Sequence, residues 1–203
     1  MQFYKEASYE PTQSRNRQFY NPQYNPTLSD GHVAEPASEK KSYNLGKGRL
    51  LEYNEWKGES RLDLRVWENK FPTKNGVVLP LKRYLVLRRL MSNITTALED
   101  VCSSKQVNLK IHLGGNVHVT VNSPYACVNI RKWYTDKRDD VVKPGKGLSL
   151  HPAQWRELCF VDSKLDRDIP ALKDTVECMQ QGDHQNLLGA LECPECCPEG
   201  YII

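Results

Sequence analysis

Apolar and polar residues alternate along several short stretches of this chain, which is the pattern of half-buried β-strands. In residues 61–67, three apolar side chains would face one side of a sheet, while the charged side chains and Trp67 would face the other. Asn75-Gly76 is typical of a hairpin turn, and a further short strand is expected to run on to Leu87. From residue 88 to residue 101 the apolar positions take helical spacing. This part of the chain therefore predicts antiparallel strands followed by one helix.

The same order of elements returns in the second half of the chain. Two pairs of segments match, 62–68 with 128–134 and 78–87 with 142–150. The offset between matched residues falls from 66 in the first pair to 64 and then 63 in the second, as loops of different length would produce. Pro152 suits the first turn of a second helix. We interpret the sequence as two tandem units, each of four strands and a helix.

Composition divides the chain into four parts. Residues 1–42 are rich in Tyr, Asn, Gln, Pro and Ser without any period, and we expect them to be disordered. Residues 43–101 form a first, degenerate repeat, residues 107–174 a second repeat, and residues 175–203 an acidic tail that contains cysteines. A unit of about 60 residues buries little surface by itself, so the two repeats should pack their helices together. The expected fold class is α+β, an intramolecular pseudo-dimer of two sheet-and-helix units.

The net charge of +3 is distributed unevenly. Residues 1–42 are neutral, residues 43–101 and 102–174 each carry +4, and residues 175–203 carry −5 without any Lys or Arg. A basic middle favours a polyanionic partner. No apolar run approaches the roughly 20 residues of a membrane-spanning helix, so no membrane association is expected.

The cysteines and the other reactive residues do not form a recognisable site in the sequence. The polar start of the chain does not resemble a secretory signal, so the seven cysteines are expected to be free thiols. Cys193-Pro194-Glu195-Cys196 supplies one Cys-x-x-Cys pair, but a structural zinc site usually needs two such pairs. Cys178, His184 and His151 lie at spacings that fit poorly. With no catalytic triad, phosphate loop or carboxylate pair, the sequence predicts no metal, no cofactor and no enzymatic activity.

Residues 129–136, 143–150 and 152–155 together resemble the positive cofactor four (PC4/p15) family of transcriptional coactivators. The match is long and ordered, from Asn-Ile-Arg-Lys-Trp-Tyr-Thr-Asp through Lys-Pro-Gly-Lys-Gly-Leu-Ser-Leu to Pro-Ala-Gln-Trp. The first repeat is similar but degenerate at residues 80–84, where the family has a glycine-rich turn. The resemblance covers roughly residues 43–172.

The resemblance implies a fold and a function. The fold is a curved four-stranded antiparallel sheet followed by one helix, paired two-fold through the helices, with Trp155 packed in the core. The function is binding of single-stranded or melted DNA without strong sequence preference, together with contacts to activators and the RNA polymerase II machinery. Family members are nuclear in eukaryotes and have no catalytic activity. Whether two chains associate further as a homodimer stays open.

Single-strand binding requires cations that follow the phosphates and aromatic faces on which bases stack. The candidate residues combine both types: Lys47, Arg49, Trp56, Lys57, Arg65, Trp67, Arg131, Trp133, Tyr134, Lys143 and Lys146. The resemblance places the family's stacking aromatic at Tyr134 and its hairpin aromatic at Trp56. Glu68 takes the place of Tyr134 in the first repeat, whereas Gly115 and Val117 replace two cations in the second. We therefore expect one asymmetric channel instead of two equivalent ones.

Two other classes of function stay open. One is an RNA-binding or repair-associated single-strand binder on the same fold, which a comparison of ssDNA with RNA of equal sequence would distinguish. The other is a protein-interaction module whose nucleic-acid surface has decayed, a view that the losses at Glu68, Gly115 and Val117 favour. A gel shift near physiological salt would separate this module from a DNA binder.

Overall fold

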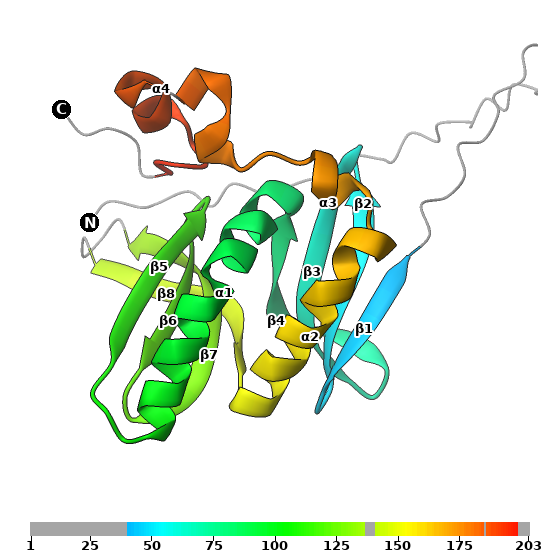
Figure 1. Ribbon diagram of the computed structural model, residues 1–203, viewed down its shortest axis with the longest axis vertical. Helices are drawn as coiled ribbons and strands as arrows, with labels where there is room; N and C mark the ends of the chain where they lie inside the picture. Colours follow the sequence, from blue (N-terminus) through cyan, green and yellow to red (C-terminus); the bar gives the residue numbers. More distant parts are fainter. Residues whose placement is uncertain (1–39, 137–140, 185, 199–203) are drawn as a thin grey trace, which may run out of the picture. The chain divides into compact units, whose positions relative to one another are not determined.

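The computed structural model describes residues 40–136, 141–184 and 186–198, and it contains two four-stranded antiparallel sheets, each followed by a helix (Figure 1). The first unit consists of β1 (Lys41–Gly46), β2 (Arg49–Trp56), β3 (Glu59–Glu68), β4 (Phe71–Pro80) and α1 (Leu81–Cys102). The second consists of β5 (Asn108–Gly114), β6 (Val117–Asn122), β7 (Tyr125–Asp136), β8 (Val141–Leu150) and α2 (Pro152–Asp168). The predicted α+β class with two sheet-and-helix units is confirmed.

Short helices make up the rest of the described chain. They are α3 (Ala171–Asp174), η1 (Cys178–Gln180), η2 (Gly182–His184) and α4 (Leu187–Glu192). None of the helices in the described ranges is both long and apolar enough to cross a lipid bilayer. Most of the segment predicted to be disordered, residues 1–42, lies outside the described residues, while Lys41 and Ser42 belong to β1.

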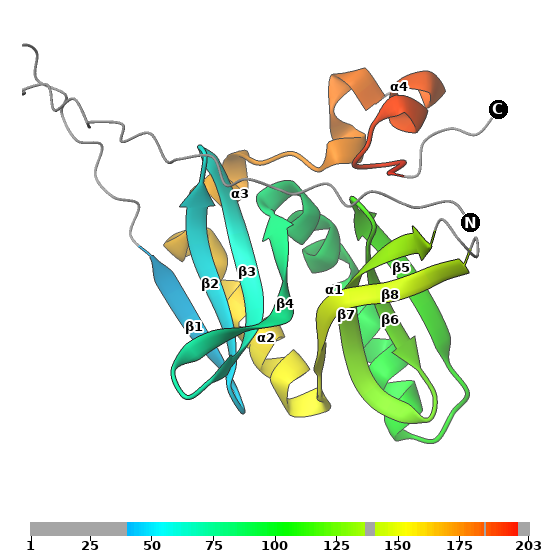
Figure 2. The same ribbon diagram turned by 180° about the vertical axis from the view of Figure 1, so that it is seen from behind.

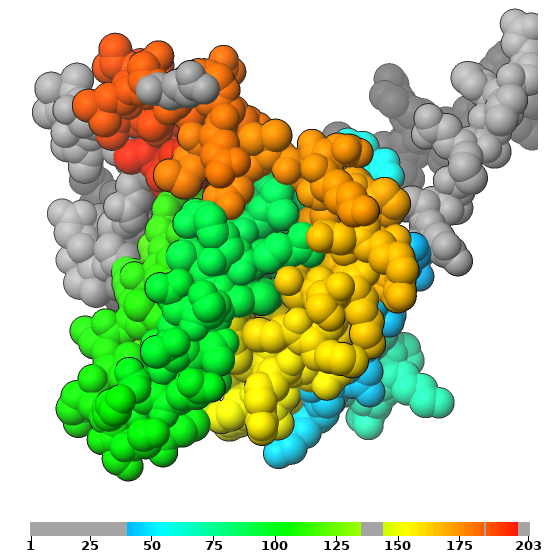
Figure 3. Space-filling view, viewed as in Figure 1, coloured from blue at the N-terminus to red at the C-terminus, as the bar shows by residue number. Residues whose placement is uncertain are grey.

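Each helix contacts the sheet of the other repeat as well as strands of its own. The first helix, α1, lies across β5, β6 and β7, and α2 lies against β1 (Figure 1). The amide Nε2 of Gln154 in α2 donates a hydrogen bond to the Gly46 carbonyl at the end of β1, at 3.0 Å. Figure 3 shows α1 and α2 side by side over this face of the molecule. The exchange means that each apolar sheet face is covered only when both repeats are present.

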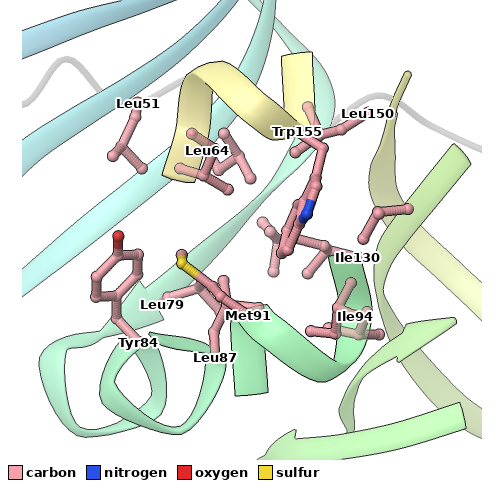
Figure 4. Packing of buried hydrophobic residues seen from close by; sticks show 14 of the residues in the cluster. Leu51, Leu64, Leu79, Tyr84, Leu87, Met91, Ile94, Ile130, Leu150 and Trp155 are labelled. Atoms are coloured by element: carbon pink, nitrogen blue, oxygen red, sulfur yellow. The ribbon is translucent and has the colours of Figure 1, made fainter. Parts of the chain in front are cut away.

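The buried core runs through both repeats and is centred on residues that occupy equivalent helix positions. Tyr84 and Trp155 are each the fourth residue of their helix, and both are fully buried (Figure 4). The indole N–H of Trp155 donates to Thr95 Oγ1 at 2.8 Å, and the Tyr84 hydroxyl donates to Asp162 Oδ1 at 2.7 Å. Burial and the neighbouring Asp162 carboxylate raise the pKa of Tyr84 well above its ordinary value. Polar groups in this core are therefore paired between the two repeats.

The structure corrects two boundaries in the first repeat. The predicted strand through Leu87 is wrong, because α1 begins at Leu81 and the apolar residues from there already follow its buried face. The predicted turn at Asn75-Gly76 is also wrong, because both residues lie within β4. The β3–β4 turn is formed by Asn69 and Lys70, whose φ values of 51° and 68° are those of a tight hairpin turn.

The register of the sheets also corrects the alignment of the two repeats. Arg65 pairs with Gly76 and Arg131 pairs with Gly147, so the two glycines are equivalent and the offset in the fourth strand is 71. A Cβ atom at Gly147 would lie 2.2 Å from the Ile130 carbonyl oxygen, and the corresponding approach at Gly76 is 2.8 Å. Both glycines therefore allow close contact at a β-bulge. The counterpart of the glycine-rich segment is residues 72–76, and not residues 80–84.

Candidate nucleic-acid interface

Figure 2 shows the second sheet from the side that faces away from the helices. The strand register places a cluster of cations and rings on this side. We call this surface the second outer face: Lys110, His112, His118, Thr120, Asn129, Arg131, Trp133. The Nζ atom of Lys110 lies 4.0 Å from the centroid of the Trp133 ring, and the rings of His118 and Trp133 meet edge to face with centroids 5.9 Å apart. His118 lies directly opposite Arg131 in the β6–β7 pair. Strand register thus gathers basic and aromatic side chains on one surface.

The centre of the second outer face is neutral. Thr120 and Asn129 pair across β6 and β7, and neither carries a charge. Ser149 of β8 donates a hydrogen bond to Asn129 Oδ1 at 2.6 Å and accepts one from Arg131 Nη2 at 3.2 Å. The Ser149 hydroxyl, unlike a carboxylate, leaves the charge of Arg131 unneutralised at this contact, and the neighbouring Asn129 adds no charge.

The equivalent surface of the first sheet has carboxylates at its centre. This first outer face is formed by Glu52, Asp63, Arg65 and Trp67, and Glu52 pairs with Asp63 as Thr120 pairs with Asn129. The Arg65 guanidinium contacts Asp63 at 3.1 Å, while Lys40 contacts Glu52 at 3.1 Å and lies 5.8 Å from the Trp67 ring centroid. Arg65 and Lys40 are therefore held by the chain's own carboxylates.

The two tryptophans are held in the same way in both repeats. The backbone N–H of Trp67 donates to the Gly48 carbonyl at 2.6 Å, and that of Trp133 donates to the Asn116 carbonyl at 2.7 Å. Within the described residues, both indole N–H groups are buried without a hydrogen-bond acceptor. The repeats thus share a backbone frame but differ in the charge beside it.

The remaining candidate residues of the first repeat are not brought together. Lys47 lies in the β1–β2 turn with a φ of 49°, whereas Trp56 and Lys57 lie at the opposite end of β2. Arg49 and Trp56 are seven residues apart along the strand, which is about 23 Å. Arg49 also shares its side of β2 with the buried Leu51, so it lies on the helix-covered face. Trp56 is 58% exposed, and the Arg61 guanidinium stacks on its ring at 5.3 Å.

Tyr134 and the lysines of β8 lie at the outer end of the β7–β8 ribbon. Tyr134 is 51% exposed and pairs with Lys143, whose side chain lies outside the described part of the structure. Alternation along β7 places Tyr134 on the opposite side of the strand from Trp133. A Cβ atom at Gly145 would lie 3.2 Å from Tyr134 Cδ1, so this glycine lets the ring lie close to β8. Lys146 is exposed beside it.

Four basic residues near these surfaces were missed from the sequence. Lys110, His112 and His118 follow the polar side of β5 and β6, and the alternation of residues 109–113 already separates them from the core. Lys74 lies between Pro72 and Gly76, as Lys146 lies between Pro144 and Gly147, and only the corrected register reveals this match.

Comparison with known proteins agrees with this geometry. Residues 111–160 match the family model of Transcriptional Coactivator p15 (PC4). Searches of curated proteins and of solved structures gave no match. The matched residues run from β5 into α2 and include most of the second outer face, while the first repeat has the same order of elements outside the match. The second repeat of this chain is therefore similar to the transcriptional coactivator p15 (PC4) family over residues 111–160.

Proposed function

We propose that this protein is a transcriptional coactivator that binds single-stranded or melted DNA and acts with the RNA polymerase II machinery in the nucleus. The match of residues 111–160 to the coactivator family model supports the class of function. The observation that carries the proposal is the second outer face, where Arg131, Lys110 and Trp133 surround a neutral centre. We infer that residues 43–101 and 107–174 act as one unit and that the second repeat supplies the principal DNA contact.

The chemistry of this surface suits an unpaired strand. A base stacked on an aromatic ring contributes about 1–3 kcal/mol, and cations beside the ring bind the flanking phosphates. The cations Arg131 and Lys110 are available for phosphate contacts beside the Trp133 ring. Because the contacts are to charge and ring faces, binding should depend on salt and only weakly on base sequence.

The substitution Asn129→Asp tests whether the neutral centre matters. The new carboxylate is isosteric with the amide and should hold Arg131 as Asp63 holds Arg65, at 3.1 Å in the first repeat. We expect ssDNA affinity at low salt to fall at least about fivefold, or about 1 kcal/mol. Fluorescence anisotropy with a labelled oligonucleotide, single-stranded and double-stranded, measures the effect.

The matched control is Asp63→Asn, which removes the equivalent carboxylate from the first outer face. We expect it to leave ssDNA affinity unchanged or to raise it, because it releases Arg65. Equal affinity for Asn129→Asp and the unsubstituted chain, both folded by circular dichroism, would contradict the assignment of the surface. Stronger binding to RNA of equal sequence would favour the RNA-binding alternative.

The aromatic residues at the two ends of the molecule should differ in importance. Tyr134→Ala removes a half-exposed ring that lies close to Gly145 and should weaken ssDNA binding about fivefold, the lower end of a stacking contribution. Trp56→Ala should change affinity less than twofold, since Glu52 and Asp63 lie on the same sheet and would repel phosphate. The same anisotropy titration compares the two variants, and a larger loss for Trp56→Ala would place the DNA on the first repeat.

The first outer face favours a second candidate function. Its carboxylate pair, Glu52 and Asp63, would repel phosphate, and its cations are already paired. This surface suits a protein partner better than DNA, in keeping with an interaction module for activators or other components of the transcription machinery.

A further inference from the structure

The segment that follows the second repeat brings three cysteines and one histidine together. Cys178 begins η1, His184 ends η2, and Cys193 and Cys196 follow α4. One potential ligand atom from each residue lies within 4.8 Å of all the others. The sequence alone favoured an acidic tail of free thiols, because the spacing Cys-x5-His-x8-Cys-x2-Cys contains only one close pair.

The distances between these atoms fit a tetrahedral ion. Cys178 Sγ lies 3.7 Å from Cys193 Sγ and 3.6 Å from His184 Nδ1, and Cys196 Sγ lies 3.5 Å from His184 Nδ1. With Zn–S near 2.3 Å and Zn–N near 2.0–2.1 Å, a tetrahedron has S–S edges of ~3.8 Å and S–N edges of ~3.6 Å. We propose that Cys178, His184, Cys193 and Cys196 bind one structural Zn²⁺ ion.

The donor set selects the metal and the type of site. Three thiolates and an imidazole suit Zn²⁺, whereas Mg²⁺ and Ca²⁺ prefer oxygen ligands. Four protein ligands leave no position for water or substrate, so the ion is structural and not catalytic. The backbone also supports the site, since the Glu195 N–H donates to Cys193 Sγ at 3.4 Å and the Cys197 N–H donates to the Cys193 carbonyl at 2.7 Å. Such contacts orient a thiolate ligand.

The segment has too small a core to fold by apolar burial alone. Of the described residues between 175 and 198, only Glu177 and Cys178 are buried. Its larger apolar side chains are exposed, with Leu187 at 75% and Leu188 at 69%. Segments this small and polar are usually held by a metal or by disulfides, and binding of the metal then supplies free energy of folding.

Specific contacts hold the segment that carries the four proposed ligands, which we call the zinc knuckle, against the two repeats. The Glu195 carboxylate accepts two hydrogen bonds from Arg83 of α1, at 2.6 and 2.7 Å, and its carbonyl accepts one from the Gly115 N–H at 2.8 Å. A Cβ atom at Gly114 would lie 2.3 Å from Glu195 Oε1, so the β5–β6 turn admits this carboxylate only because it carries glycine. Figure 3 shows the segment, in orange, against one end of α1. Glu195 lies between two ligands, so the ion would fix the contact that anchors the segment.

The zinc knuckle lies next to the second outer face. A hollow of about 290 Å³ lies between Cys196, Cys197 and Pro198 on one side and Lys110, His112, Asn116 and His118 on the other. The knuckle therefore forms a wall beside the second outer face, and loss of the ion should loosen that wall.

Metal analysis of the full chain purified under reducing conditions tests the proposal. We expect one zinc per chain, and titration of the metal-free chain with Co²⁺ should give the thiolate charge-transfer and d–d bands of a tetrahedral site at one equivalent. Cys178→Ser and Cys193→Ser should each lower the zinc content and abolish these bands. Cys197→Ser is the matched control, since Cys197 neighbours Cys196 but lies outside the cluster, and it should retain one zinc.

Limited proteolysis gives a readout that does not depend on any variant. Removal of zinc by a chelator should expose residues 175–198 to cleavage, while the two repeats stay resistant because their cores lie elsewhere. Absence of stoichiometric Zn²⁺ or Co²⁺ binding by the reduced chain would overturn the proposal. Retention of the metal in both Cys178→Ser and Cys193→Ser would overturn it as well.

Discussion

Replacing Trp155 by alanine should lower the free energy of unfolding by about 3–5 kcal/mol, the usual range for removing a fully buried large aromatic side chain. The Trp155 side chain has 0% exposure and lies among residues from both repeats (Figure 4). Its loss also leaves Thr95 Oγ1 without the indole donor. Urea denaturation followed by circular dichroism measures the change, with the slope of the transition checked for two-state behaviour.

A control on the same helix separates packing from helix propensity. Phe160→Ala removes another large aromatic residue from α2, but Phe160 is 56% exposed, so the stability should change by less than about 1 kcal/mol. The loss of stability in Trp155→Phe should fall between the losses in Trp155→Ala and Phe160→Ala, because phenylalanine keeps most of the volume but loses the hydrogen bond. A Trp155→Ala variant as stable as Phe160→Ala would contradict the packing described for the core.

Separating the two repeats should abolish independent folding. If the chain is divided between α1 and β5, at Lys105, neither piece should form a folded monomer, because each sheet would lose its contacts with the helix of the other piece. An equimolar mixture should form a folded one-to-one complex. Circular dichroism and analytical ultracentrifugation of the pieces, alone and mixed, measure this.

Ion pairs between the repeats should favour the one-to-one complex of the two different pieces over a dimer of identical pieces. In the intact chain, Arg88 of α1 contacts Asp162 at 2.7 Å and Asp166 at 2.6 Å in α2. Each of these ion pairs joins one repeat to the other, so two copies of the same piece cannot form them. Arg88→Ala should therefore weaken the mixed complex, and a cooperatively folded monomer of either piece would contradict the helix exchange.

Local sequence patterns determined much of the fold. Alternation in residues 61–67 predicted a half-buried strand, and β3 has Leu62 and Leu64 buried with Asp63 and Arg65 on the outer face. The strand prediction succeeded because the period of buried residues in one strand or helix is set by that element's own geometry. The resemblance to the coactivator family, and not a local period, placed Trp155 in the core, and this residue is fully buried.

The predicted element boundaries were wrong where a local sequence signal has another role in the folded structure. Asn75-Gly76 has the composition of a hairpin turn, but Gly76 is needed because the carbonyl of Leu64 approaches β4 closely. The start of α1 was placed seven residues too late, because the apolar residues from Leu81 to Leu87 are compatible with either a strand or a helix. As a result, the sequence alignment matched residues 80–84 to the glycine-rich segment of the second repeat, whereas the strand register matches residues 72–76 to it.

The sequence by itself determined the class of most elements, the duplication, the resemblance of the second repeat to the coactivator family and the types of residue available for binding. Only the tertiary structure decided which helix covers which sheet, that Glu52 faces Asp63 where Thr120 faces Asn129, and that Cys178 and His184 reach the Cys193–Cys196 pair. The physical reason is the range of the interactions. Strand and helix periods arise between near neighbours in the chain, whereas helix exchange, charge pairing across strands and ligand clusters depend on how distant segments meet in space.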